Sequence, residues 1–543
     1  MKSSDIQSSN ININSCDMPF ESNNITNYNP LHNEVGIKPE KLVSRYLEKL
    51  TYNKYVFEDI YGNKKVCFKK FITLVDYVKF LIGKYKPEDM EKLPSLENKN
   101  ESKFETYINS YNNYAYVDGY FYYLTSKLLK LGFVHGLEYY DNYICIRNNC
   151  EINIADDFEY LADSNFFNEN NNKLFKFKDP NFVKMYNSTV PLSISDENVE
   201  LITESLDDLN LDNLNLKPEC LDNEEDIKEE QYKNSLEDSS DDSDHSTVDL
   251  SDEEETNMND DNLSINSNET EDWETEEEDQ ESFDNDEIND LTLIINKIPT
   301  QVVALECCDT TFDSILENNE IKIEELESAM FQVIAMLYMY QQVFKFTHND
   351  LHTNNIMCIN TTEEFLYYTI LGKHYKIPTF GRIYKIIDFG RSIYSVNNVL
   401  LCSDSFSENG TANTQYNFKP FYNLNKPIIE PNYSFDLCRL ACSMVDFIID
   451  DMSELNKYRK QVPVYDLIIS WLYDDNGVNI LYKKNGEERY PDFKLYKMIA
   501  RLVHNHTPEK QFDHYCFKKY VLSELETNKK YMNLDEIKNQ VHL

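Results

Sequence analysis

The sequence that decides the fold is FTHNDLHTNNIM at residues 346–357, followed by IIDFG at residues 386–390 and YSFDLCRL at residues 433–440. The first stretch comes after a long amphipathic segment and before a short strand-like one, and the second ends an apolar strand in Asp-Phe-Gly. The third places Asp436 at the start of an apolar helix. The order and context of the three stretches make their combined signal far more specific than any one of them alone.

The residue types in these stretches suit phosphoryl transfer, which depends on positioning and charge neutralisation more than on covalent chemistry. One carboxylate must orient the attacking hydroxyl and accept its proton, and a second must hold Mg²⁺ against the triphosphate. A neutral oxygen ligand can complete the metal shell without excess negative charge. Asp350, Asp388 and Asn355 supply this set, and the short step from Asp350 to Asn355 lets one loop reach both the nucleophile and the metal.

With these motifs the chain resembles the protein-kinase-like superfamily, and its Asn- and Tyr-rich style resembles the serine/threonine kinase-like proteins of giant DNA viruses, of the mimivirus type. The resemblance implies an α+β, two-lobe fold with a small sheet-rich N-lobe and a helical C-lobe. It also implies that ATP and Mg²⁺ are the cofactors, that Asp350 is the catalytic base, and that Asn355 and Asp388 bind the metal. His348 and Asp436 would then brace the catalytic loop.

The N-terminal half matches the family less well, because Gly-x-Gly-x-x-Gly is absent and the hairpin before residues 66–70 has only Gly62. If residues 66–70 form the third strand, the resemblance implies that Lys70 or Lys69 contacts the α- and β-phosphates. We favour Lys70, with Asp118 on the next long helix as its ion-pair partner. Both lysines could instead face solvent on an edge strand.

The stretch Leu305–Cys308 resembles the hinge between the two lobes of a kinase. The resemblance implies that the backbone of Glu306 and of Cys308 binds adenine. Cys307 and Cys308 are better interpreted as small buried residues than as a redox pair.

Two residues depart from the family's usual His-Arg-Asp-Leu-Lys-x-x-Asn. Asn349 replaces the Arg that in many kinases grips a phosphorylated activation loop, so we do not expect switching by loop phosphorylation. His352 replaces the Lys, and a neutral His would contact the transferring phosphate with weaker charge support. The step from Asn355 to Asp388 is longer than the family's short hairpin, which predicts an extension of that hairpin over residues 361–382.

The net charge of -44 is concentrated in one part of the chain. Residues 196–290 hold 39 acidic and 3 basic residues, which predicts a disordered insert that could attract a basic partner. We expect a disordered tail over residues 1–40, an N-lobe built from residues 41–195 and 291–306, and a helical C-lobe over residues 307–543. The expected strands cover residues 55–57, 66–71, 137–146, 302–305, 356–359 and 384–387, and the expected helices cover residues 114–131, 311–316 and 321–342.

Composition also excludes several classes of protein. Nucleic-acid binding needs clustered Lys and Arg, and a membrane span needs a run of about 18 apolar residues, so neither partner is expected. The 12 Cys are scattered without CxxC pairs, and the N-terminus lacks an apolar signal core. We therefore expect a soluble protein of a reducing compartment that is not secreted, the host cytoplasm or a virion if the chain is viral.

The favoured function is transfer of the γ-phosphate of ATP to a Ser or Thr hydroxyl of a protein substrate. A small-molecule kinase of the choline or aminoglycoside type is favoured by His-Asn-Asp and the missing Lys, but Asp-Phe-Gly argues against it. A pseudokinase scaffold is favoured by the absent Gly-rich loop, but the complete set of Asp350, Asn355 and Asp388 argues against it. The structural alternatives are loop capping for Asp350 and Asn355, a strand-end turn for Asp388 and an ordinary N-cap for Asp436.

Overall fold

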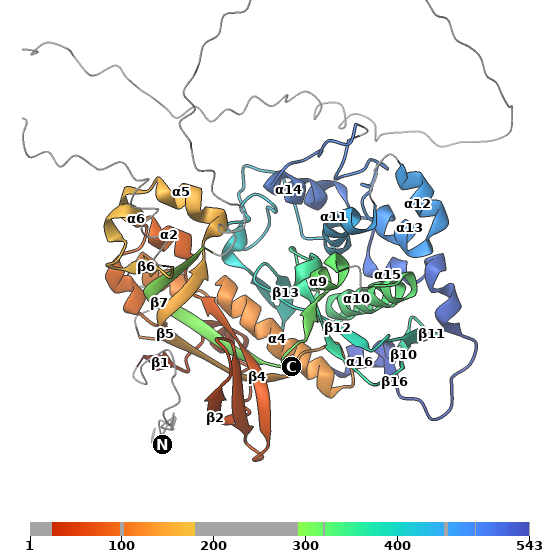
Figure 1. Ribbon diagram of the computed structural model, residues 1–543, viewed down its shortest axis with the longest axis horizontal. Helices are drawn as coiled ribbons and strands as arrows, with labels where there is room; N and C mark the ends of the chain where they lie inside the picture. The colour runs from red at the N-terminus through yellow and green to blue at the C-terminus, as the bar shows by residue number, and fades with distance from the viewer. Residues whose placement is uncertain are drawn as a thin grey trace, which may run out of the picture. The chain divides into compact units, whose positions relative to one another are not determined.

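A curled antiparallel sheet dominates the N-terminal part of the protein (Figure 1). The computed structural model describes residues 24–97, 102–179, 291–318, 321–449, 454–483 and 485–541. The strands lie in the order β1 (Ile25–Thr26), β5 (Tyr139–Asn153), β7 (Thr292–Leu305), β4 (Lys64–Thr73), β3 (Lys54–Asp59) and β2 (Val43–Lys49), and β6 (Phe175–Phe177) pairs with β7. The sheet curls so far that the N–H of Leu42, just before β2, donates to the carbonyl of Tyr140 on β5 at 2.8 Å.

The curled sheet encloses an apolar interior on one of its faces. Its buried core consists of Val43, Tyr55, Phe57, Cys67, Tyr140 and Ala304. The Lys69 side chain also lies in this interior, where its Nζ sits 3.3 Å from the ring centre of Tyr46 and 4.0 Å from that of Tyr55. Lys70 points to the opposite face, because successive side chains of a strand alternate. The edge-strand alternative for the two lysines is wrong, since β4 pairs with β3 on one side and with β7 on the other.

Helix α4 (Tyr114–Lys130) packs against the other face of the sheet. Its apolar residues recur at helical spacing, and the Asn113 side chain caps its first turn by accepting from the N–H of Ala115. Gln301 of β7 donates to the Ala115 carbonyl at 2.9 Å, so helix and strand lie very close together. Gly119 makes this approach possible, because a Cβ there would sit 1.8 Å from the Gln301 side chain.

The disordered tail expected over residues 1–40 is a wrong prediction for its second half, while residues 1–23 lie outside the described part of the chain. Residues Ile25–Thr26 form β1, which pairs with β5, and α1 (Pro30–Val35) follows. The Asn29 side chain caps α1, and Leu31 is fully buried. This segment lacks apolar periodicity of its own. It is ordered by its contacts with β5 and α4, which a periodicity in the sequence does not reveal.

The acidic insert expected at residues 196–290 also lies outside the described residues. The described chain stops and resumes at neighbouring positions of one sheet, since Phe177 of β6 pairs with Leu293 of β7. The remaining helices of this part are α2 (Tyr77–Leu81), α3 (Lys103–Ile108), α5 (Phe158–Ala162) and α6 (Asn165–Asn170).

The C-terminal part is mainly helical, as expected, and its described residues also form three small sheets. Its helices are α9 (Phe312–Glu317), α10 (Ile323–Phe344), α11 (Phe435–Ile448), α12 (Leu455–Gln461), α13 (Pro463–Ser470), α14 (Phe493–Leu502), α15 (Pro508–Gln511) and α16 (Leu534–Gln540). The sheets have the orders β12 (Arg382–Ile386), β9 (Ile356–Asn360), β8 (Thr310–Thr311); β15 (Val521–Leu522), β11 (Lys373–Pro378), β10 (Phe365–Ile370), β16 (Tyr531–Asn533); and β13 (Ile393–Val396), β14 (Val399–Cys402).

Helix α10 forms the centre of this part and is buried along nearly its whole length. Two acidic residues in its first turn, Glu324 and Glu325, complement the positive end of the helix dipole. The hairpin extension predicted over residues 361–382 is confirmed as β10 and β11, which pair over six residue pairs. Within the described ranges, no helix is both long and apolar enough to cross a bilayer.

Candidate functional site

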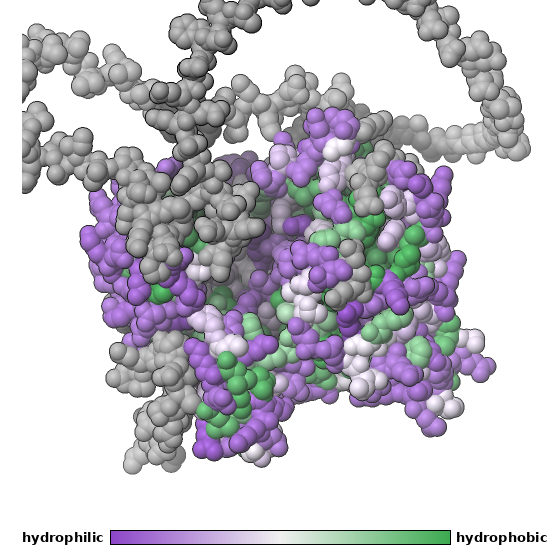
Figure 2. Space-filling view, in the orientation of Figure 1, coloured by the Kyte–Doolittle hydropathy of each residue, from purple (hydrophilic) through white to green (hydrophobic). Residues whose placement is uncertain are grey.

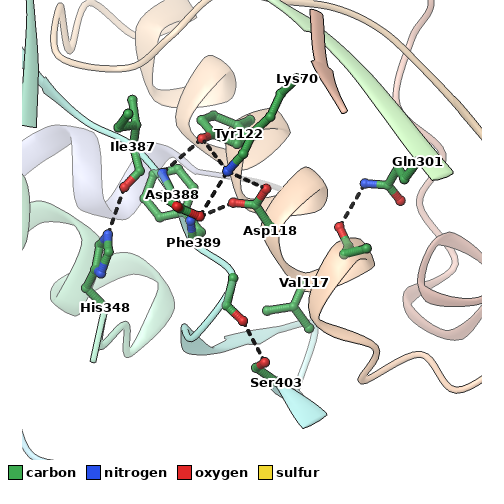
Figure 3. A network of polar contacts seen from close by, with 12 residues as sticks. Lys70, Val117, Asp118, Tyr122, Gln301, His348, Ile387, Asp388, Phe389 and Ser403 are labelled. Atoms are coloured by element: carbon green, nitrogen blue, oxygen red, sulfur yellow. Dashed lines mark hydrogen bonds and ion pairs between the residues drawn. The ribbon is translucent and has the colours of Figure 1, made fainter. Parts of the chain in front are cut away.

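Lys70 on β4 stands between two carboxylates (Figure 3). Its Nζ lies 2.8 Å from Oδ2 of Asp118 on α4 and 2.9 Å from Oδ1 of Asp388. Tyr122, one turn after Asp118 on α4, places its hydroxyl 3.4 Å from the same Nζ. Sequence analysis missed Tyr122, although its position four residues after Asp118 on one helix is a readable signal.

The electrostatics of this cluster follow from its shared cation. Burial alone would lower the pKa of Lys70, but the carboxylates of Asp118 and Asp388 hold that pKa well above its ordinary value. Lys70 in turn lowers the pKa of Asp388, so this carboxylate stays ionised. Burial raises the pKa of Asp118 to about 6 despite the attraction of Lys70. The side chain of Asp388 is 52% exposed, so it can still bind a further cation.

The backbone around Asp388 is fixed by α4. The N–H of Asp388 donates to the Tyr122 hydroxyl at 2.9 Å, and the N–H of Phe389 donates to Oδ1 of Asp118 at 2.6 Å. Asp388 has a φ of 63°, a left-handed conformation that is costly for a residue other than glycine. Phe389 is fully buried, with its ring centre 4.6 Å from that of Phe121. Asp388 does lie just after the end of a strand, as the structural alternative expects. Its carboxylate also pairs with Lys70, however, and a residue that served only to form a turn would not need that ion pair.

Asp436 connects α11 to the loop at residues 348–355. Its carboxylate accepts the backbone N–H of His348 at 2.9 Å and that of Asn349 at 2.8 Å. Burial raises the pKa of Asp436 to about 7, although these two N–H donors oppose the change. The N-cap alternative for Asp436 is wrong, since its carboxylate binds a segment far away in the sequence. His348 extends the connection through Nε2, which lies 2.9 Å from the Ile387 carbonyl just before Asp388.

Asn355 has its amide group oriented by the same loop. Its Nδ2 donates to the carbonyl of Asp350 at 2.9 Å and to Nε2 of His352 at 3.0 Å. Both amide hydrogens are thereby used, which leaves Oδ1 as the atom able to bind a cation. The carbonyl of Asn355 accepts the N–H of Ile387 at 2.9 Å, so Asn355 lies beside the residue before Asp388. An amide oxygen and an ionised carboxylate in adjacent loops fit a hard divalent cation such as Mg²⁺.

Both carboxylate oxygens of Asp350 have partners that sequence analysis missed. Tyr496 on α14 donates its hydroxyl to Oδ1 at 2.7 Å, and Nη1 of Arg391 lies 3.4 Å from Oδ2. Arg391 directly follows Asp-Phe-Gly and could have been noticed there, whereas no local pattern links Tyr496 to a loop so far away in the sequence. The loop-capping alternative for Asp350 has no support from these contacts, because its side chain accepts from other segments.

Asn349, at the position where many kinases have Arg, is fully buried and holds three segments together. Its Nδ2 donates to the carbonyls of Thr347 at 3.2 Å and of Arg391 at 2.9 Å. Its Oδ1 accepts the hydroxyl of Tyr416 at 2.8 Å. The segment after Asp-Phe-Gly is therefore fastened to the loop by neutral hydrogen bonds.

The stretch expected to be a hinge follows β7. The N–H of Glu306 donates to the Glu138 carbonyl at 2.9 Å, and the Glu306 carboxylate pairs with buried Lys385 at 2.8 Å. Among the described residues, the carbonyl of Glu306 and the N–H of Cys308 have no hydrogen-bond partner. These are backbone groups that could bind an adenine edge. Burial raises the pKa of the Cys308 thiol to about 12, which argues against a redox role.

The turn nearest to Lys70 is not the hairpin that contains Gly62. The β2–β3 turn ends at Asn53, whose carbonyl accepts the N–H of Lys69 at 2.7 Å, whereas Gly62 lies in the β3–β4 turn at the other end of the strands. Residues 50–53 read LTYN and contain no glycine.

The surface is hollowed and hydrophilic between the sheet and the helical part (Figure 2).

Comparisons with known proteins give partial matches to protein kinases. The chain is 32% identical over 88 residues to a serine/threonine-protein kinase haspin homolog of Arabidopsis thaliana, covering 16% of this chain and 15% of that protein. It is 32% identical over 82 residues to the serine/threonine-protein kinase haspin of Bos taurus, covering 15% of this chain and 10% of that protein. An uncharacterized protein of Caenorhabditis elegans is 36% identical over 63 residues, which cover 12% of this chain and 21% of that protein.

No family model matches the chain. The chain matches no more than 21% of the length of any of these three relatives. These similarities relate part of the chain to protein kinases.

Proposed function

We propose that this protein is an ATP- and Mg²⁺-dependent kinase with a two-lobe kinase-like fold, which transfers the γ-phosphate to a Ser or Thr hydroxyl of a protein substrate. The observation that carries the proposal is the position of Lys70 between Asp118 and Asp388, since these residues come from a strand, a helix and a loop of separate parts of the chain. A cation held by two carboxylates in this way is already positioned beside the proposed phosphate site before ATP binds.

Each remaining residue then has a defined role. Lys70 binds the α- and β-phosphates, and Asp388 and Asn355 hold Mg²⁺, which neutralises phosphate charge when bound. The carbonyl of Glu306 and the N–H of Cys308 bind adenine. Asp350 orients the acceptor hydroxyl and accepts its proton, while His348 and Asp436 hold the loop in place.

The acidic insert is proposed to attract a basic partner through its excess of carboxylates. A protein substrate is favoured over a small molecule because two of the partial relatives are named as serine/threonine-protein kinases. A pseudokinase scaffold remains the second candidate, because the turn of residues 50–53 lacks glycine.

The test is transfer of γ-phosphate from Mg·ATP by the full-length protein, with casein, choline and an aminoglycoside offered as separate acceptors. We expect labelled casein and no labelled small molecule. Asp350→Ala and Asp388→Ala should abolish transfer, because each removes an interaction needed in the transition state. Transfer to choline or the aminoglycoside would replace the proposed substrate class, and full activity of both variants would refute the assigned chemistry.

A further inference from the structure

The candidate site has an uneven distribution of positive charge. Lys70 is already shared by Asp118 and Asp388, on the side where the nucleotide phosphates would bind. On the side of Asp350, the loop has His352 where the family's usual motif has Lys, and Nε2 of that ring lies 3.0 Å from Nδ2 of Asn355. A phosphoryl group arriving beside the Asp350 carboxylate needs a cation there to offset the repulsion between the two anions.

Arg391 lies where this cation is needed. Its Nη1 is 3.4 Å from Oδ2 of Asp350, and among the described residues it is the one Lys or Arg that forms an ion pair with Asp350. The guanidinium stays charged at any physiological pH. Its side chain is 28% exposed, so it is neither sealed in the core nor free in solvent.

The position of Arg391 is fixed both at its backbone carbonyl and at its guanidinium group. The Asn349 amide donates to the Arg391 carbonyl at 2.9 Å, which ties this residue to the loop that carries Asp350. The guanidinium lies 5.7 Å from the ring centre of Tyr496, the residue that holds the other oxygen of Asp350. Arg439, the other nearby arginine, lies against the same ring at 5.0 Å and forms no ion pair with Asp350 among the residues described.

We infer that Arg391 is the cation that stabilises the transferring phosphoryl group on the acceptor side of the site, in place of a charged side chain at His352. The inference rests on the proposed function. In the step concerned, the bond between the acceptor oxygen and the γ-phosphorus forms, and the bond from that phosphorus to the β,γ-bridging oxygen breaks. ADP leaves with the electron pair, and the acceptor proton passes to Asp350. Arg391 offsets the negative charge on the equatorial phosphoryl oxygens during this exchange.

The test moves the charge between two positions of the full-length protein. Arg391→Gln removes the cation, Arg391→Lys keeps it, and the double variant Arg391→Gln/His352→Lys restores a cation from residue 352 of the loop that carries Asp350. Two acceptors are used, casein and water, so that phosphate release from Mg·ATP reports on the site without a protein substrate. Arg459→Gln is the matched control, because Arg459 pairs with Asp466 at 2.7 Å on α12 and α13, outside the candidate site.

We expect Arg391→Gln to lower kcat by about 10²- to 10³-fold, as when one charge-stabilising donor is removed from other active sites, with little change in the KM for ATP. Arg391→Lys and the double variant should each recover at least about tenfold of this loss. Unchanged kcat in Arg391→Gln would overturn the inference. A loss of kcat in Arg391→Gln that neither Arg391→Lys nor the double variant recovers would also overturn the inference. Such a result would mean that Arg391 acts through its shape and packing and not through its positive charge.

The failure of the inference and that of the proposed function give different results. If wild type and Asp388→Asn release phosphate from Mg·ATP equally slowly, the proposed function falls and the role of Arg391 falls with it. If wild type is active, Asp388→Asn is inactive and Arg391→Gln behaves as Arg459→Gln does, only the role of Arg391 is refuted. Melting temperatures of all variants identify any that fail to fold.

Discussion

Replacing Lys70 by Met tests the assignment of the two adjacent lysines on β4. Methionine keeps the length of the side chain and its apolar stem but removes the cation between Asp118 and Asp388. Lys69→Met is a matched control, because Lys69 belongs to the same strand but lies on its opposite face, in the interior of the curled sheet. Lys70→Met and Lys69→Met therefore remove a positive charge from opposite faces of β4.

The expected magnitude follows from the two contacts of the Lys70 ammonium group, at 2.8 Å with Asp118 and 2.9 Å with Asp388. In the transition state the same ammonium donors would face phosphate oxygens, and a hydrogen bond to a charged group contributes about 1.5–3 kcal/mol, so two such bonds amount to about 3–6 kcal/mol. At 1.36 kcal/mol per tenfold change in rate, Lys70→Met should lower kcat/KM by roughly 10²- to 10⁴-fold. The lower part of this range is expected, because the Asp388 side chain is 52% exposed and solvent screens its contact.

The assay is kcat/KM for Mg·ATP with casein as acceptor, together with the melting temperature of each variant. We expect Lys70→Met to be nearly inactive and Lys69→Met to keep wild-type activity, because the Lys69 ammonium group lies against the rings of Tyr46 and Tyr55 in the interior of the curled sheet, on the face of β4 opposite to Lys70. The assignment of Lys70 to the site is refuted if Lys69→Met loses activity while Lys70→Met keeps it. A folded Lys70→Met with unchanged kcat/KM would also refute it.

Three further predictions concern the support of the site. Asp436→Ala leaves two buried backbone N–H groups without an acceptor, at a cost of about 1–3 kcal/mol each. Calorimetry should therefore show a clearly lower Tm for this variant, and an unchanged Tm would contradict the prediction. Asp118, whose pKa burial raises from 3.8 to about 6, must be ionised to pair with Lys70, so kcat/KM should fall as the pH drops through 6. A pH–rate profile without a fall on the acid side would argue against this pairing. The contribution of Asp118 to folding stability depends on pH in the opposite direction, because it is fully present below pH 3.8 and is lost as the pH rises through 6. Deleting residues 200–288 should leave Tm nearly unchanged, because Phe177 and Leu293 on either side of that segment are already paired; a large fall in Tm would show that the segment supports the fold.

The sequence predicted the helical and strand elements best where one periodicity dominates. The helices predicted at residues 114–131 and 321–342 correspond to α4 (Tyr114–Lys130) and α10 (Ile323–Phe344) with ends shifted by one or two residues, because their apolar side chains recur at helical spacing and both helices are buried. Residues 24–40 were predicted poorly, since β1 and α1 are stabilised by pairing with β5 and by burial of Leu31, which are not local properties.

The candidate site was predictable wherever residues lie in one motif. Asp350, Asn355 and Asp388 stand within two short stretches, and the structure places those stretches side by side through the N–H of Ile387 and the carbonyl of Asn355. Asp118 could be proposed for Lys70 because a long helix follows the strand. The partner that sequence could not supply is Tyr496, because only the tertiary structure brings α14 to the loop.

The most direct test of the whole account is a single-turnover measurement of γ-phosphate transfer from Mg·ATP by wild type and by Asp350→Asn, with ATP binding measured on the same samples. Asp350→Asn keeps Lys70, Asn355 and Asp388, so it should bind Mg·ATP as wild type does and yet fail to transfer phosphate. Transfer by Asp350→Asn at the wild-type rate, or equal inactivity of the wild type, would contradict the central claim that this site is built for phosphoryl transfer.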